Sequence, residues 1–134
     1  DNTLVLKEDP AHNAYVDITD AVRDIKVHVD YGYYNYDDWM DEHSEITVMS
    51  GDEGVIELTF IFPGIIEGGE LITITREDGT KEEIPLRTNV VEHEIQAEPW
   101  QLVPLKFDYN FYTQDAGEQR SSYRLATLVQ INVR

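Results

Sequence analysis

Leu71-Ile72-Thr73-Ile74-Thr75-Arg76-Glu77-Asp78-Gly79-Thr80-Lys81-Glu82-Glu83-Ile84-Pro85-Leu86 is the stretch that most clearly indicates the fold class. Apolar and polar side chains alternate on both sides of residues 77–80, which is typical of two antiparallel strands joined by a tight turn. We expect Asp78-Gly79 to form a two-residue type I′ turn, in which both central positions have positive φ. The apolar residues that would then share one face are Ile72, Ile74, Ile84 and Leu86.

The same period of two recurs along most of the chain, and it is the signature of half-buried strands. The predicted strands are residues 3–7, 14–18, 23–31, 45–49, 54–62, 71–76, 81–86, 89–97, 103–111 and 123–133. Both alternating sets of residues 54–62 are largely apolar, so we expect this strand to be central and covered on both sides.

Helix is scarce, with one turn expected within residues 18–24 and another within residues 37–44. Turn signals recur every 8–12 residues or so, about the spacing of a sandwich or barrel. We therefore predict an all-β fold. Its architecture would be an antiparallel β-sandwich of jelly-roll or immunoglobulin-like type, with about nine or ten short strands in a single domain over residues 1–134.

The charge of the chain restricts its partners. Its 134 residues include 27 acidic and 10 basic side chains, a formal net charge of −17. Nucleic-acid backbones and anionic lipid headgroups are bound through Lys and Arg, so we expect neither nucleic acid nor a membrane as partner. No apolar run approaches the roughly 20 residues of a membrane-spanning helix.

The chain contains no cysteine, which excludes disulfides, zinc–thiolate sites and thiol nucleophiles. It opens with Asp1 rather than Met, so we interpret it as a mature or excised domain of a larger secreted protein. Together these features favour a bacterial extracellular or cell-surface protein.

No catalytic motif is evident, and we expect no enzyme activity. Glycine-rich phosphate loops, nucleophile elbows and zinc-protease motifs are all missing. The four histidines, His12, His28, His43 and His93, lack the spacing that places two imidazoles on one metal ion. We expect His93 to be hydrogen bonded in the core or at an interface, and His28 to face solvent.

The richest candidate surface is the stretch from Asp30 to His43, which holds four of the eight tyrosines and one of the two tryptophans. Aromatic rings supply rigid contact area, while Asn and Asp supply hydrogen bonds, and sugars need both kinds of contact. We interpret this stretch as a recognition loop that follows a strand. The candidate ligand-binding residues are Tyr34, Asn35, Tyr36, Asp37 and Trp39.

The roles of the other aromatic residues in and around this stretch stay open. Tyr31 continues the inward-facing set of its strand, and Tyr33 does so if the strand extends, so both would then belong to the core. Trp100 and Tyr112 either belong to the same rim as the recognition loop or plug the other end of the fold.

The same loop is a candidate Ca²⁺ site, because hard cations are bound by clusters of carboxylate oxygens. The candidate ligands are Asp37, Asp38, Asp41 and Glu42. Their spacing matches no EF-hand, and a solvated acidic loop is the other interpretation.

The leading hypothesis is a non-catalytic, glycan-binding module without a required cofactor. The alternative is a structural or assembly module, such as an immunoglobulin-like spacer, an adhesin domain or a subunit of a phage or other particle. In that case another protein would be the partner, and the aromatic residues would lie in the core or a protein interface.

Overall fold

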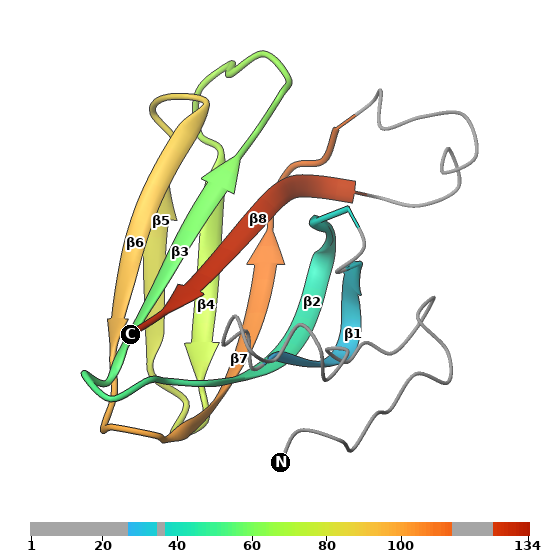
Figure 1. The fold of residues 1–134 in the computed structure, drawn as a ribbon. Helices are drawn as coiled ribbons and strands as arrows, with labels where there is room; N and C mark the ends of the chain where they lie inside the picture. Colours follow the sequence, from blue (N-terminus) through green and yellow to red (C-terminus); the bar gives the residue numbers. More distant parts are fainter. Residues whose placement is uncertain (1–26, 35–36, 114–124) are drawn as a thin grey trace.

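The computed structural model describes residues 27–34, 37–113 and 125–134, which form eight strands and no helix (Figure 1). The strands are β1 (Val27–Tyr34), β2 (Trp39–Met49), β3 (Val55–Ile61), β4 (Leu71–Arg76), β5 (Lys81–Pro85), β6 (Val90–Gln96), β7 (Leu102–Tyr109) and β8 (Leu125–Val133). These residues therefore include no helix that could cross a membrane.

Each strand predicted within the described residues is present. The strands predicted at residues 3–7 and 14–18, and the turn predicted at residues 18–24, lie outside the described residues. The helical turn predicted within residues 37–44 is wrong, because β2 already begins at Trp39. Residues 39–44 lack a period of two, and their extended form comes from pairing with β1 and β8.

The eight strands form one antiparallel sheet that curls into a half-barrel. The strand order is β5-β4-β7-β2-β8-β3-β6, and β1 pairs with β2 off this path. Along β2, residues 43–49 pair with β7, whereas residues 39–41 pair with β8. The sheet therefore divides beyond β2 into one wall of β7, β4 and β5 and another of β8, β3 and β6 (Figure 1).

The core fills the inside of this curl. Phe60 on β3 packs edge-on against Phe107 and Tyr109 on β7, with ring centroids 6.1 and 6.4 Å apart. Each of these rings is almost completely buried, as are Ile72 and Ile84 on the predicted hairpin. Because β7 and β3 lie in different walls, these aromatic contacts hold the two walls together.

The predicted sandwich is confirmed only at the level of class. The fold is all-β and antiparallel, but its strands belong to one curled sheet, so the jelly-roll or immunoglobulin-like topology stays a prediction. Strand β3 is central, between β6 and β8, but it is not covered on both faces. Glu57 and Thr59 on its outer face are partly exposed.

The hairpin of β4 and β5 is present, but its turn differs from the prediction. Ile72 pairs with Ile84 and Thr75 with Lys81, so residues 77–79 form a three-residue connection. The Gly79 amide donates to the Arg76 carbonyl oxygen, and Gly79 has a φ of 90°. Asp78 does not have a positive φ, so the turn resembles a type I turn followed by a left-handed glycine instead of a type I′ turn.

Candidate functional site

The described residues of the aromatic stretch from Asp30 to His43 form a β-hairpin, in contrast to the predicted loop. Its first residues belong to β1 and its last to β2, with Tyr34 paired to Trp39 next to the turn. Successive side chains of a strand point to opposite faces of the sheet, so the position of each aromatic residue along β1 and β2 decides whether it faces the core or the surface.

Tyr31 lies outside the core, in contrast to the prediction from alternation. The register of β1 against β2 shifts on both sides of Tyr31, and Gly32 has a φ of 79°. A Cβ at Gly32 would lie 2.5 Å from the His43 carbonyl oxygen, so only glycine fits here. This bulge leaves Tyr31 57% exposed, with its ring centroid 6.1 Å from that of His43.

Tyr33 belongs to the core, as predicted for the case in which its strand extends. It is 7% exposed, and its hydroxyl lies 2.9 Å from the Val129 carbonyl oxygen and 3.3 Å from Asp38 Oδ1. Burial, and then the neighbouring Asp38 carboxylate, raise the pKa of the Tyr33 hydroxyl. The hydroxyl therefore stays protonated and links β1 to β8.

The predicted ligand-binding residues divide into two groups. Tyr34 and Trp39 are partly exposed and pair across the hairpin, and Asp37 lies in the turn beside them. The Tyr34 hydroxyl donates to Asp41 Oδ2 at 3.1 Å. Asn35 and Tyr36 lie outside the described residues.

A polar cluster flanks Tyr31 on the same side of the hairpin. His43 Nδ1 lies 2.6 Å from Asp108 Oδ1 on β7, and His43 Nε2 lies 2.8 Å from Glu45 Oε2. The hydrogen bond with Asp108 and then that with Glu45 raise the pKa of His43. Glu45 pairs with Tyr31 across the hairpin, so an exposed ring, an imidazole and two carboxylates adjoin one another.

The candidate Ca²⁺ ligands are engaged within the protein. Asp38 faces Tyr33, Asp41 accepts from Tyr34, and Asp37 Oδ1 lies 3.4 Å from the Trp39 amide nitrogen. Burial raises the pKa of Asp38, against the lowering effect of the Tyr33 hydroxyl. Across residues 27–34, 37–113 and 125–134, no three His, Asp or Glu side chains are arranged to hold a metal ion.

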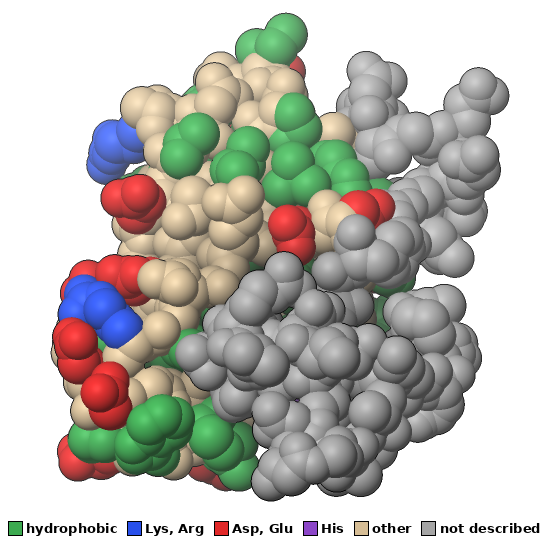
Figure 2. All heavy atoms as spheres, viewed as in Figure 1, with side chains coloured by type: hydrophobic (Ala, Val, Ile, Leu, Met, Phe, Trp, Pro, Cys, Tyr) green, Lys and Arg blue, Asp and Glu red, His purple; other side chains and the backbone are tan. Residues whose placement is uncertain are grey.

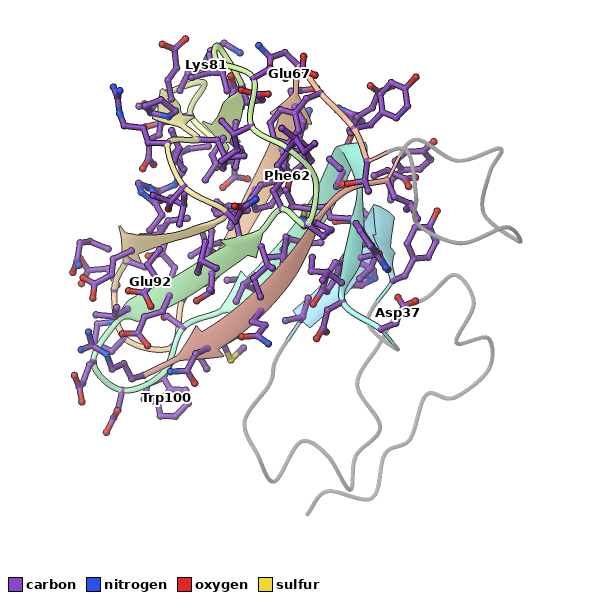
Figure 3. The ribbon with its side chains drawn as sticks, turned by 90° about the horizontal axis from the view of Figure 1, so that it is seen from above. Asp37, Phe62, Glu67, Lys81, Glu92 and Trp100 are labelled. Carbon is purple, nitrogen blue, oxygen red and sulfur yellow. The ribbon has the colours of Figure 1, made fainter. Side chains whose placement is uncertain are left out.

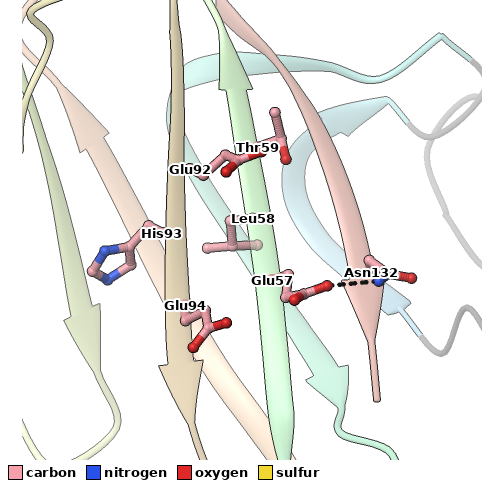
Figure 4. A pocket seen from close by; sticks show the side chains of 7 residues that line it. All are labelled: Glu57, Leu58, Thr59, Glu92, His93, Glu94 and Asn132. Atoms are coloured by element: carbon pink, nitrogen blue, oxygen red, sulfur yellow. Dashed lines mark hydrogen bonds between the residues drawn. The ribbon is translucent and has the colours of Figure 1, made fainter.

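An open depression of about 310 Å³ lies over β3, β6 and β8 (Figure 4). Asn132 donates to Glu57 Oε1 at 2.7 Å, and Arg134 contacts Glu57 and Glu94. The hydrogen bond from Asn132 and then that from Arg134 lower the pKa of Glu57. In Figure 4 the His93 ring lies on the other side of β6 from Glu57, so these groups do not converge on one point.

The predictions for two histidines are confirmed. His93 is partly buried, with Nε2 2.7 Å from Glu82 Oε1 on β5, which is the expected hydrogen-bonded interface position. The His28 side chain is 65% exposed.

Trp100 does not share a rim with the hairpin turn. It is 60% exposed, and Figure 3 places it well apart from Asp37. Nor does it plug the end of the fold, because its ring is not part of the core cluster.

Sequence reasoning missed the roles of Tyr31, His43 and Asp108. Alternation placed Tyr31 in the core, although Gly32 directly after it was a signal for a bulge. His43 and Asp108 are 65 positions apart, and only the pairing of β2 with β7 brings them together.

Comparison of the chain with protein-family models, curated proteins and solved structures gives no match.

Proposed function

We propose that this chain is a non-catalytic binding module of a bacterial extracellular or cell-surface protein, and that its ligand is a glycan. The proposed site is the outward side of the β1–β2 hairpin. Its described residues are Tyr31, Tyr34, Asp37 and Trp39, with His43, Glu45 and Asp108 beside them. Asn35 and Tyr36 are included on the sequence alone.

The exposure of Tyr31 is the observation that supports this proposal most. A tyrosine ring that faces water loses the stabilisation that burial of its surface would have supplied. Here the bulge at Gly32 holds the Tyr31 ring in that exposed position. The C–H face of a sugar can stack on such a ring, while its hydroxyls donate to nearby carboxylates. Glu45 and Asp108 are the acceptors next to Tyr31.

The polar cluster adds preorganisation to this surface. His43 bridges the two carboxylates, so they are held in place before a ligand arrives. A site fixed in advance loses less side-chain entropy on binding than one that must be ordered. We further propose that the half-barrel, whose two walls pack through aromatic rings, is an open form of the jelly-roll or immunoglobulin-like sandwich.

Glycan-array binding followed by titration calorimetry tests the proposal. We expect Tyr31→Ala to weaken binding of the best glycan about tenfold or more, which corresponds to about 1.4 kcal/mol. The melting temperature of Tyr31→Ala should equal that of the wild type, because the Tyr31 ring is exposed. Trp100→Ala is the matched control, since it removes an equally exposed ring far from the hairpin, and it should bind normally.

Absence of binding to any glycan, or full binding by Tyr31→Ala, would refute the proposal. Titrations with and without millimolar Ca²⁺ test whether Asp37, Asp38, Asp41 and Glu42 contribute a metal site. If Ca²⁺ raises neither the affinity nor the melting temperature, that role is excluded.

The second candidate function is a structural or assembly module. The burial of Tyr33 favours it, because this aromatic residue supports the fold and cannot contact a ligand. A molar mass that rises with concentration in light scattering would support assembly, and a constant monomer mass would count against assembly with copies of the same chain.

A further inference from the structure

A second exposed aromatic surface lies at the opposite end of the half-barrel. Three connections come together there, at residues 50–54, 77–80 and 97–101 (Figure 1). Figure 2 shows hydrophobic side chains gathered at this lower end of the molecule. Trp100 is 60% exposed and Leu102, at the start of β7, is 59% exposed.

The backbone at Trp100 is in an unfavourable conformation. Its φ is 56°, a left-handed value that a bulky aromatic residue rarely adopts. Apart from Asp38, it is the only non-glycine residue with positive φ in the described part of the chain. Such strain persists only where the surrounding structure enforces it, and it concentrates at functional positions.

Hydrogen bonds to the 50–54 connection enforce this conformation. The Trp100 amide donates to the Gly51 carbonyl oxygen at 3.0 Å, and the Gln101 amide donates to Ser50 Oγ at 2.9 Å. Ser50 is buried, and its hydroxyl donates to the Glu98 carbonyl oxygen at 2.6 Å. The connection is thus rigid, and it presents the indole to solvent instead of burying it.

An open depression of about 250 Å³ adjoins this surface. Gln101, which lies between the two exposed apolar residues, lines it together with Val103 and Pro104 on one side and Arg76 and Asp78 on the other. A rigid, exposed tryptophan is the kind of anchor that dominates the energy of protein interfaces.

The charge around this end determines which partner fits. The three connections carry the carboxylates of Asp52, Glu53, Glu77, Asp78 and Glu98. Of the basic groups next to these connections, Arg76 pairs with Glu82, Arg134 pairs with Glu53, and Lys81 donates to Thr75 Oγ1 at 3.2 Å. A second copy of a chain with net charge −17 would be repelled, whereas a basic partner would be attracted.

We propose that Trp100 and Leu102 form a docking surface for another protein, and that this partner presents an apolar side chain flanked by Lys or Arg. This site is separate from the proposed glycan site, and it does not depend on glycan binding.

A displayed library of random peptides, selected on the intact protein and counter-selected on Trp100→Ala, tests this inference. We expect the enriched peptides to carry an apolar residue next to Lys or Arg. A synthetic peptide of the consensus should bind the wild type at least about tenfold more tightly than Trp100→Ala or Leu102→Ala. Ile65→Ala is the matched control, because Ile65 is 83% exposed and lies in another loop.

Trp100→Gly separates this role from a structural one. Glycine adopts positive φ without strain, so this variant should have a higher melting temperature than the wild type and yet lose the peptide. Tyr31→Ala should keep the peptide, which makes failure of this inference distinguishable from failure of the glycan proposal.

Three results would overturn the inference. They are an enriched consensus that is acidic or lacks apolar residues, equal peptide binding by Trp100→Ala, and destabilisation by Trp100→Gly. Light scattering tests the remaining alternative. If the wild type is a dimer and Trp100→Ala is a monomer, a second copy of the chain occupies this surface, and the proposal of a basic partner is overturned.

Discussion

His93 Nε2 on β6 lies 2.7 Å from Glu82 Oε1 on β5, and this contact joins the two strands at opposite ends of the sheet order. No ladder pairs β5 with β6 within the described residues, so side chains span the open seam of the half-barrel. Arg76 on β4 also contacts Glu82, with Nη1 3.3 Å from Oε2, and its Nη2 donates to the Gln96 carbonyl oxygen on β6 at 3.5 Å. Glu82 is therefore the acceptor shared by both neighbours.

We predict that Glu82→Ala destabilises the protein by about 1–2 kcal/mol, because it leaves a partly buried histidine and arginine without their acceptor. Urea denaturation measures the effect. Glu83→Ala is the matched control, since Glu83 is exposed on the same strand and should change stability by less than about 0.5 kcal/mol. Equal effects of the two substitutions would show that the Glu82 contacts across the seam do not stabilise the protein.

Gly32→Ala should destabilise the protein by about 2 kcal/mol or more. The added Cβ would clash with the His43 carbonyl oxygen, and alanine disfavours a φ of 79°. Gly69→Ala separates the two effects, since Gly69 has a φ of 90° but open space around it, and it should cost only about 1 kcal/mol. Thermal unfolding of both variants gives the comparison, and an equal loss would argue against the steric contact.

The His43 contacts predict a pH dependence. The hydrogen bond to Asp108 and then that to Glu45 raise the pKa of His43 above its ordinary value of 6.5. The resulting stabilisation is fully present below pH 6.5 and is lost as the pH rises through the raised pKa. Because the cluster is exposed to solvent, we expect less than about 1 kcal/mol.

Nuclear magnetic resonance titration of the His43 ring measures this pKa directly. Asp108→Asn should lower it further than Glu45→Gln does, because Asp108 is the larger cause of the shift. A His43 pKa at or below the ordinary value in the wild type would contradict the bridging geometry.

The buried hydroxyl pair of Tyr109 and Thr127 predicts a coupling. Thr127 Oγ1 donates to the Tyr109 oxygen at 3.0 Å, and the Tyr109 hydroxyl donates to Met40 Sδ. Tyr109→Phe alone leaves the Thr127 donor buried without a partner, and we expect a loss of about 1–3 kcal/mol. Adding Thr127→Val should restore much of it, as a double-mutant cycle by denaturation would measure. Strict additivity would show that the hydrogen bond is not important.

The positions of the strands could be predicted from the sequence because burial on one face of a strand leaves a period of two. Val103, Leu105, Phe107 and Tyr109 alternate in β7 and are all buried. The presence of a hairpin at residues 71–85 could be predicted for the same reason. Its turn could not be predicted, because Asp-Gly pairs occur in two-residue and three-residue connections alike.

The candidate site was harder to predict. The sequence located the aromatic stretch and assigned Tyr33 to the core as one interpretation. It placed Tyr31 incorrectly, since alternation alone does not reveal the register shift at Gly32. The strain at Trp100 was also hidden, because it depends on hydrogen bonds to Gly51 and Ser50, which lie about half the described chain away.

By itself the sequence determined the all-β class and the acidic surface, because both follow from local patterns and from composition. The tertiary structure alone decided that the sheet curls into a half-barrel, that β2 contacts both walls and that His43 meets Asp108. The physical reason is that strand register and curvature depend on pairing between distant segments. No local period encodes that pairing.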